Sequence, residues 1–168
     1  IDAHMANQQA EAAANIVKDY NLSRGDADAP IQFVEFGNYK CPFCHRVQPT
    51  VDQLLEKYGD KMHHSFKHMP IDGTSFEAAK ALQAATEQGN DKAWRFFGLM
   101  WDESTLDNDT FVRVAEASDL NIADFNKYRE SDEAEQRVQA DIADAAALGG
   151  SGTPFFVING PGISGAQP

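Results

Sequence analysis

The chain has 168 residues, of which 42% are hydrophobic and 24% are charged, which is enough for one soluble domain with a substantial core. Its 14 lysines and arginines against 26 aspartates and glutamates give a net charge of −12, the wrong sign for contacts with nucleic-acid phosphates. No run approaches the roughly 20 apolar residues of a membrane-spanning helix, and the given sequence does not open with a positively charged lead and an apolar stretch. We therefore expect neither a nucleic-acid partner nor a membrane span.

The N-terminal residues are expected to contribute little to the fold. Residues 1–5 (IDAHM) are interpreted as an expression remnant, which leaves the natural upstream sequence open. Residues 6–22 are rich in helix formers, but their apolar positions are mostly alanine before Ile16. They predict an N-terminal helix that packs only at its end, followed by a polar turn over residues 23–30.

The next segment has the order strand, helix, strand. Residues 31–36 (IQFVEF) are β-branched and aromatic, which predicts a buried strand. Residues 62–69 (MHHSFKHM) alternate well enough to predict a second strand. Between them, apolar side chains near helical spacing predict an amphipathic helix that begins about residue 42 and ends at Gly59.

Residues 74–148 are predicted to be almost wholly helical, with breaks near Gly89, Ser104 and Leu120. An aromatic and apolar stripe in this segment is predicted to form the core of a helical domain. The alternative is that part of the stripe lines a groove for a peptide, because exposed apolar patches beside a reactive site bind unfolded chains. The stripe consists of Trp94, Phe97, Leu99, Met100 and Trp101.

The strands return after the helical segment. Residues 155–158 (FFVI) predict a third apolar strand, which turns at Asn159 and Gly160 into residues 162–164. We therefore predict an α/β fold with a helical domain inserted between the second and third core strands. The predicted domains are the core, residues 23–73 and 149–168, and the insertion, residues 74–148.

Cys41 and Cys44 are the two cysteines of the chain, and they stand two residues apart where the predicted helix follows the first strand. This spacing is typical of a redox-active pair rather than of a disulfide scaffold. The free N–H groups and positive dipole end of a helix N-terminus stabilise an anion, so we predict that Cys41 is the nucleophilic thiolate. Pro42 suits the first helical turn. Cys44, one turn in and more buried, would resolve the mixed disulfide.

Two further side chains are candidates for tuning this pair. His45, if protonated, would add positive charge near the Cys41 sulfur, although a solvated first-turn histidine is the alternative. Glu35 stands in the middle of an apolar strand, where a charge needs a reason. We expect Glu35 to be buried, the alternative being a carboxylate at a strand edge in water.

These features together resemble the DsbA-like branch of the thioredoxin-fold superfamily over residues 31–168. The matching features are the CPFCH motif at the start of a helix, a glutamate six residues before it, the helical insertion, and Gly-Thr-Pro before an apolar strand. The resemblance implies that Cys41 forms the mixed disulfide with a substrate and that Cys44 resolves it. It also implies that Glu35 assists proton movement at Cys44.

The resemblance further implies where the substrate binds. The Thr153–Pro154 peptide bond is expected to be cis, in a loop beside the active site whose backbone pairs with an extended substrate. Pro42 and Phe43 are expected to contact the same substrate. A closing helix is implied after the last strand, but the sequence ends at Pro168 without it, so we expect that helix to be missing here or supplied by another chain.

The implied function is a thiol–disulfide oxidoreductase of the bacterial periplasm or cell envelope, which acts on cysteine-containing proteins or peptides without a metal or organic cofactor. A redox partner would reoxidise it, and in the bacterial envelope we expect this partner to be a membrane-bound quinone-linked oxidase. Strong oxidases of this type usually carry histidine where this chain has Phe43, and valine where it has Thr153. A dithiol oxidase is favoured. A reductase or isomerase of the same fold, or a redox-sensing module fused to a larger protein, are the alternatives.

A zinc site is a further interpretation of the cysteine pair, because CxxC is also half of such a site. The remaining ligands would have to be His63, His64 and His68. His63 and His64 are neighbours on a predicted strand and so point to opposite faces, where we expect them to be surface histidines. The sequence therefore favours a redox pair over a metal centre.

Overall fold

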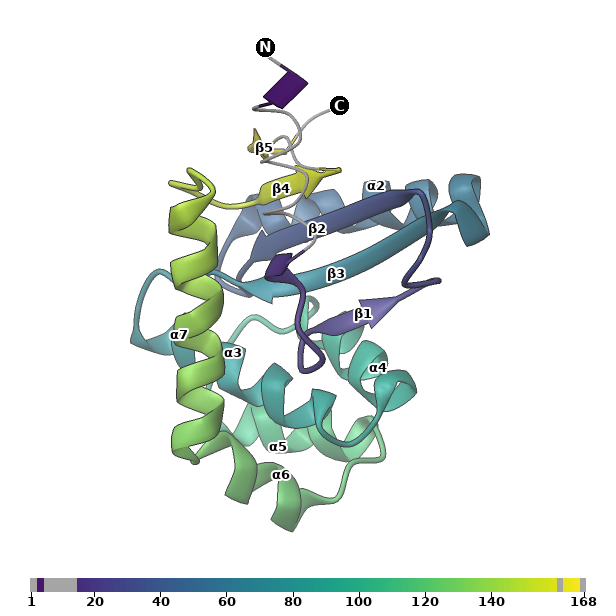
Figure 1. The fold of residues 1–168 in the computed structure, drawn as a ribbon. Coiled ribbons are helices and arrows are strands. Elements are labelled where there is room, and N and C mark those ends of the chain that lie inside the picture. Colours follow the sequence, from purple (N-terminus) through teal and green to yellow (C-terminus); the bar gives the residue numbers. More distant parts are fainter. Residues whose placement is uncertain (1–2, 5–14, 160–161, 167–168) are drawn as a thin grey trace.

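A computed structural model describes residues 3–4, 15–159 and 162–166, arranged as a sheet with helices on both faces (Figure 1). The strands follow the order β1–β3–β2–β4–β5 across the sheet. β2 and β3 are parallel and are joined by the crossover that a parallel pair requires, whereas the other neighbouring pairs are antiparallel. The strands are β1 (Leu22–Arg24), β2 (Ile31–Gly37), β3 (Met62–His68), β4 (Phe155–Ile158) and β5 (Gly162–Ser164).

The helices occupy distinct positions around this sheet. α2 forms the crossover against one face, α7 runs along the opposite face, and α3 to α6 gather beneath the sheet (Figure 1). Because α3 to α7 all lie between β3 and β4 in the chain, the predicted helical insertion is present. The helices are α2 (Pro42–Tyr58), the 3-10 helix η1 (Gly59–Lys61), α3 (Gly73–Thr86), α4 (Asn90–Met100), α5 (Asn108–Ala117), α6 (Ile122–Arg129) and α7 (Asp132–Ala147).

Strand alternation divides the side chains of β2 between two cores. Phe33 packs with Val47 of α2, and Val34 and Phe36 pack with Ala145 of α7. The buried strand predicted for residues 31–36 is therefore present, with its side chains divided between the two faces of the sheet. Its consequence for function is that every second residue of β2 faces the helix that carries the cysteines.

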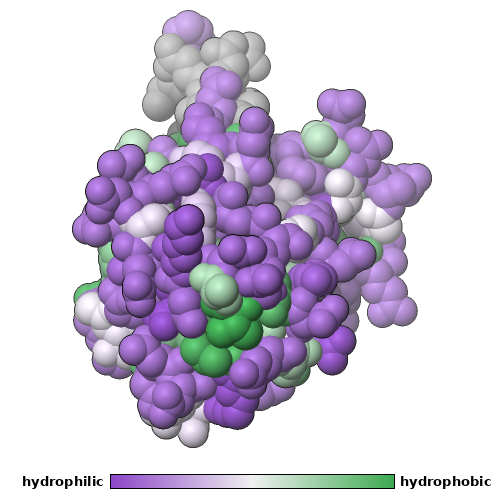
Figure 2. Space-filling model, turned by 90° about the horizontal axis from the view of Figure 1, so that it is seen from below, coloured by the Kyte–Doolittle hydropathy of each residue, from purple (hydrophilic) through white to green (hydrophobic). Residues whose placement is uncertain are grey.

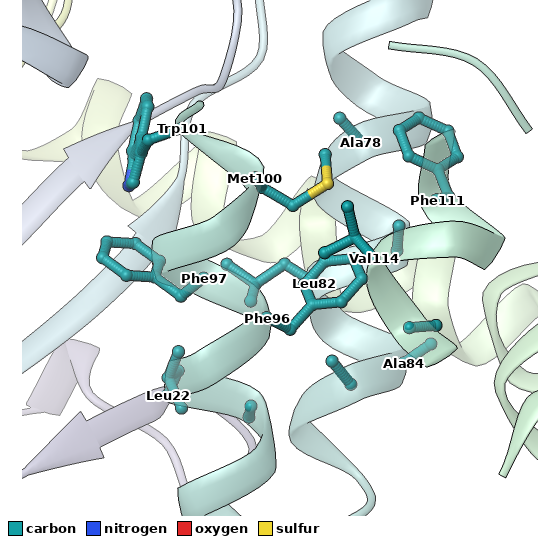
Figure 3. Packing of buried hydrophobic residues seen from close by; sticks show 14 of the residues in the cluster. Leu22, Ala78, Leu82, Ala84, Phe96, Phe97, Met100, Trp101, Phe111 and Val114 are labelled. Atoms are coloured by element: carbon teal, nitrogen blue, oxygen red, sulfur yellow. The ribbon is translucent and has the colours of Figure 1, made fainter. Parts of the chain in front are cut away.

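The insertion has an apolar core of its own. Phe96 and Met100 of α4 converge with Leu82 of α3 and with Phe111 and Val114 of α5 (Figure 3). The predicted aromatic stripe belongs to the same cluster, so its assignment to the core is confirmed. Within the stripe the buried residues are Phe97, Met100 and Trp101, and the partly buried ones are Trp94 and Leu99.

Four of the five insertion helices begin where the sequence supplies a side-chain cap, and α4 begins after Gly89 without one. Asp72, Asp107, Asn121 and Ser131 each accept a hydrogen bond from a backbone N–H in the first turn of α3, α5, α6 and α7, respectively. Such caps satisfy N–H groups that have no partner within the helix, and each contributes about 1 kcal/mol. The polar runs between the helices therefore set their boundaries.

The N-terminal segment differs from the prediction. Residues 15 and 16 are helical, but Leu22–Arg24 forms β1 where the sequence predicted the end of a helix and the start of a turn. Three residues carry too little periodicity to identify a strand, and pairing with β3 determines the conformation. Most of the predicted N-terminal helix lies outside the described residues.

The prediction that His63 and His64 lie on the surface is wrong. Only 8% of His63 and none of His64 is exposed. β3 lies between β1 and β2, and helices cover both faces of the sheet, so adjacent residues of this strand are buried on both sides. They do point to opposite faces, because alternation is a property of the strand whether or not it is exposed.

A buried ion cluster ties α7 to β3. The Nζ of Lys67 lies 3.2 Å from Asp141 Oδ1 and 2.7 Å from Asp144 Oδ2, and it also donates to the carbonyl of Ile16. The second oxygen of Asp141 accepts the backbone N–H of His68 at 2.9 Å. Every polar group of Lys67 and Asp141 thus has a partner, which is what a buried pair requires.

The surface reflects the acidic composition. Seen from below, it is mostly hydrophilic, with a compact hydrophobic patch near its middle (Figure 2). No helix within residues 15–159 and 162–166 is long and apolar enough to cross a membrane, and none follows β4. On the α2 side of the sheet, an apolar hollow of about 140 Å³ is lined by residues that include Phe33, Leu54, Phe156 and Ile163.

Candidate active site

The sulfur of Cys41 serves as the cap at the start of α2. Its Sγ accepts the backbone N–H of Cys44 at 3.2 Å, and Pro42 occupies the first helical position, where a missing N–H costs nothing. An atom in this position lies at the positive end of the helix dipole. The predicted placement of the pair at a helix N-terminus is therefore present, and both cysteines are free thiols.

The two cysteines differ in environment. Cys41 is 8% exposed, whereas Cys44 is fully buried. Gly37, the last residue of β2, packs directly on the Cys44 sulfur: a Cβ built on this glycine would lie 3.2 Å from Cys44 Sγ. Only Cys41 can therefore be approached by a protein substrate without local opening of the fold.

The hydrogen bonds around the pair separate the acidities of the two thiols. The side chain of Cys44, then Thr153 and the N–H groups of Cys44 and Phe43, lower the pKa of Cys41 to about 6, against the opposing effect of burial. The hydrogen bond to Cys41, together with burial, raises the pKa of Cys44 far above its ordinary range. The arrangement favours one thiolate, on the outer sulfur.

The reduced protein is therefore expected to show a single thiolate, detected by its ultraviolet absorbance, with a midpoint near pH 6.

The low pKa of Cys41 also makes stability depend on pH. A thiol whose pKa is lower in the folded than in the unfolded chain stabilises the fold; this stabilisation is complete above the unfolded-state pKa and is lost as pH falls through the folded-state pKa. The free energy of unfolding of the reduced form should thus rise between about pH 6 and pH 9. Urea unfolding of the disulfide form is the control and should lack this rise. A midpoint near 9 would contradict the geometry described.

The loop before β4 lies against Cys41, although it is 112 residues away in the chain. The carbonyl oxygen of Thr153 is 3.6 Å from Cys41 Sγ, and the Thr153–Pro154 peptide bond is cis. Asn38 ties this loop to the end of β3, because its Nδ2 donates to Thr153 Oγ1 at 3.4 Å and to the Met69 carbonyl at 3.0 Å. The loop is thereby held beside the outer sulfur.

Two residues of the motif face outward. Phe43 is 53% exposed, with the guanidinium of Arg46 5.1 Å from its ring centroid. His45 stacks on Trp101 with ring centroids 6.0 Å apart, and its Nε2 lies 4.0 Å from Asp102 Oδ1. Because the ring of His45 is directed toward the insertion, its effect on Cys41 stays a prediction.

Glu35 lies fully buried on the side of β2 that faces α2, as its place in the strand predicted. Gln48 Nε2 donates to Glu35 Oε1 at 2.6 Å and to the carbonyl of Cys44 at 2.9 Å, so it links the carboxyl group to the helix turn of the inner cysteine. His64 Nε2 lies 3.1 Å from Glu35 Oε2. The sequence analysis missed Gln48, although its position four residues after Cys44 on a helix was a usable signal.

The histidines named in the zinc interpretation do not gather around the cysteines. They lie along β3, and His64 is engaged with Glu35. In the part of the chain that the structure describes, no group of three or more His, Cys, Asp and Glu side chains could hold a metal ion.

Comparison with known proteins places the chain in a family. A family model described as thioredoxin matches residues 17–168. A curated relative, the Na(+)/H(+) antiporter NhaA 1 of Mycobacterium sp. (strain KMS), is 33% identical over 146 residues, which cover 82% of this chain but 23% of the antiporter. The chain spans about a quarter of the length of the curated relatives it matches.

Solved structures give the same result for the fold. A thioredoxin-like oxidoreductase from Silicibacter pomeroyi is 26% identical, with a TM-score of 0.83 over 94% of this chain and 89% of that one. The thiol-disulfide exchange protein alpha-DsbA2 from Wolbachia pipientis is 21% identical, with a TM-score of 0.85 over 100% of this chain and 94% of that one. The predicted α/β thioredoxin-like fold with its helical insertion is confirmed, and the chain belongs to the thioredoxin family.

Proposed function

We propose that this protein is a thiol–disulfide oxidoreductase that forms disulfides in cysteine-containing protein substrates through Cys41 and Cys44. One observation carries the proposal. The outer sulfur caps a helix and has a pKa of about 6, whereas the inner sulfur is buried and holds its proton. A pair with this asymmetry has one nucleophile and leaving group facing the substrate and one resolving thiol behind it.

The proposed reaction starts from the disulfide form of the pair. A substrate thiolate attacks Cys41 Sγ, the Cys41–Cys44 bond breaks, and Cys44 leaves as a thiolate that takes up a proton. A second substrate thiolate then attacks the substrate sulfur of the mixed disulfide and expels the Cys41 thiolate. The substrate loses two electrons, and the pair gains them. We assign to Glu35 the exchange of the proton at Cys44.

Substrate binding is assigned to the surface around the outer sulfur. Thr153 and Pro154 hold backbone groups beside Cys41, where an extended peptide could pair with them. The exposed ring of Phe43 and the neighbouring Pro42 offer apolar contact. Contacts of this kind, mostly to backbone, would suit many unrelated substrates.

The oxidising direction is favoured by the low pKa of Cys41, because stabilising the thiolate stabilises the reduced form and makes the disulfide a stronger oxidant. We expect a reduction potential above about −200 mV when the pair is equilibrated with glutathione. A potential near −270 mV, similar to that of thioredoxin, would indicate a reductase instead. A pair that does not form a disulfide would contradict the proposal.

Proposals about location and partner follow from the oxidising direction of the proposed reaction. Protein disulfides persist in oxidising compartments, so we place this protein in the bacterial periplasm or cell envelope. Each turnover leaves the pair reduced, so a partner must reoxidise it, and a membrane-bound quinone-linked oxidase fits that role.

The match to antiporters favours a second candidate. A segment similar to this chain occurs within proteins named Na(+)/H(+) antiporters that are about four times its length. The second candidate function is therefore that of a redox-sensing module of a larger protein. Insulin reduction and oxidation of a dithiol peptide distinguish the two candidates. A sensor would show a titrating cysteine pair with negligible multiple turnover, whereas an oxidoreductase would turn over repeatedly.

A further inference from the structure

The buried carboxyl group of Glu35 has two polar partners. Gln48 donates to Oε1 at 2.6 Å, and His64 Nε2 lies 3.1 Å from Oε2. Glu35 and His64 are both fully buried, and Gln48 is 9% exposed. At such a site the direction of each hydrogen bond determines which protonation state of the carboxyl group fits.

Arg24 determines the tautomer of His64. The two residues lie opposite each other across the β1–β3 pair, and Arg24 Nε donates to His64 Nδ1 at 3.1 Å. A guanidinium has no acceptor atom and keeps its protons, so Nδ1 must be the accepting nitrogen. The proton of the neutral ring is then on Nε2, which points it at Glu35 Oε2.

Arg24 is itself held in place from two sides. Its guanidinium stacks 4.2 Å from the Trp94 ring centroid, and it lies 3.4 Å from Asp52 Oδ1 on α2. The position of the Arg24 guanidinium beside His64 is therefore fixed by contacts from α2 and α4, so its hydrogen bond to His64 does not depend on a freely rotating side chain.

The amide of Gln48 is also fixed in direction. Its Nε2 has two hydrogens, and two oxygens accept them, one on Glu35 and one on the Cys44 backbone. Both oxygens of Glu35 therefore face donors. In a protonated carboxyl group the O–H would point at one of these N–H donors and find no acceptor there, so the two hydrogen bonds fit the carboxylate form.

We propose that His64 is a positioning residue of the exchange reaction, fixed by Arg24 as a neutral N–H donor that keeps Glu35 a carboxylate ready to accept the Cys44 proton. This inference rests on the proposed function. The resolving step is the reverse of the attack that opens the Cys41–Cys44 bond in the proposed reaction. In it, the Cys44 thiol gives its proton to Glu35, its sulfur bonds to Cys41 Sγ, and the bond between Cys41 and the substrate breaks to release a substrate thiolate. His64 touches neither sulfur and acts through Glu35.

The charged and titratable groups around this site come from several elements. Arg24 approaches from β1, Asp52 and Cys44 from α2, and Tyr39 from the loop after β2, where burial and Glu35 raise the pKa of the phenol. His63 is next to His64 on β3 but points to the other face. Burial, reinforced by Arg24 and opposed by Glu35, lowers the pKa of His64. The ring therefore stays neutral across the pH range in which the cysteines react.

The kinetic test separates the two chemical steps. Reduced protein is mixed with an activated aromatic disulfide in a stopped-flow instrument between pH 5 and pH 9. Its acidic leaving thiol drives the exchange forward even for an oxidising pair, so that attack by Cys41 and resolution by Cys44 appear as two phases. In His64→Leu, we expect the resolving phase near pH 7 to slow about 10- to 100-fold, the loss for one hydrogen bond to a charged group, with the first phase unchanged. His64→Gln keeps an N–H near the position of Nε2 and should restore the resolving rate to within about threefold. Wild-type resolution in His64→Leu would overturn the proposal.

Nitrogen-15 NMR of the ring supplies a test that does not depend on turnover. Wild-type His64 should be the neutral Nε2–H tautomer at pH 7, and Arg24→Met should allow the Nδ1–H or charged form to appear. Arg24 is partly exposed, so this variant keeps the test available if His64→Leu does not fold. An Nδ1–H or charged ring in the wild type would overturn the proposal. Absence of both kinetic phases in the wild type, with the tautomer as expected, would instead count against the proposed function.

Discussion

Replacement of Cys41 by serine is expected to lower the rate of disulfide exchange by at least about a thousandfold, because the hydroxyl cannot form the mixed disulfide at all. The serine oxygen can still accept the N–H of residue 44 and cap α2, so the variant should fold. Oxidation of a dithiol peptide, followed by mass spectrometry of the product, measures the loss. Exchange that persists in this variant would show that Cys41 is not the sulfur that forms the mixed disulfide.

The matched control is Cys44→Ser, which removes the resolving thiol and keeps the outer one. This variant should accumulate a mixed disulfide between Cys41 and a peptide substrate, visible as a covalent adduct that a reductant releases. The two serine variants are similar in size and polarity but predict opposite products, no adduct and a trapped adduct. A trapped adduct in both, or in neither, would contradict the assignment of roles.

Replacement of Lys67 by methionine should lower the free energy of unfolding by about 3–5 kcal/mol. The substitution keeps the apolar stem but leaves Asp141 as a fully buried charge without its cation. Urea unfolding measures the loss. Because the cluster lies on the α7 side of the sheet, the reduction potential of the cysteine pair should not change.

Removal of the second charge tests this explanation. In Lys67→Met combined with Asp141→Asn, no buried charge is left unpaired at that position, so the double variant should be more stable than Lys67→Met alone. Asp144→Asn is the milder comparison, because 28% of that side chain is exposed. A Lys67→Met protein as stable as the wild type would show that the ion cluster contributes nothing to stability.

The core strands and the cysteine pair were predictable because their signals are local. Residues 31–36 and 155–158 are short apolar runs beside turn signals, and the CPFCH motif precedes a clear amphipathic helix. β1 was missed because three residues give no measurable periodicity and pair with β3 only in the folded chain. The same omission led to the error at His63 and His64, since β1 converts β3 from an edge strand into an interior one.

The site was predictable in part. The N-terminal position of Cys41 and the burial of Glu35 follow from spacing along a helix and a strand. The contact between Arg24 and His64 depends on the register between two strands 40 residues apart, which no local pattern specifies. The polar contacts around Glu35 therefore depend on the folded sheet and could not be predicted from the sequence.

Alternation along β3 also places two buried polar clusters on opposite faces of the sheet, separated by the hydrogen-bonded strands. His64 meets Glu35 on the side of α2, whereas Lys67, three residues later, meets Asp141 and Asp144 on the side of α7. On the side of α2, Glu35 meets the Nε2 of His64, with the Arg24 guanidinium on the far edge of that ring, whereas the Lys67 ammonium lies on the other side of the sheet. A slip of β3 by one residue would exchange the faces and bring the cation toward the cysteines. The register of β3 therefore determines both the packing of the sheet and which charged groups lie near Glu35.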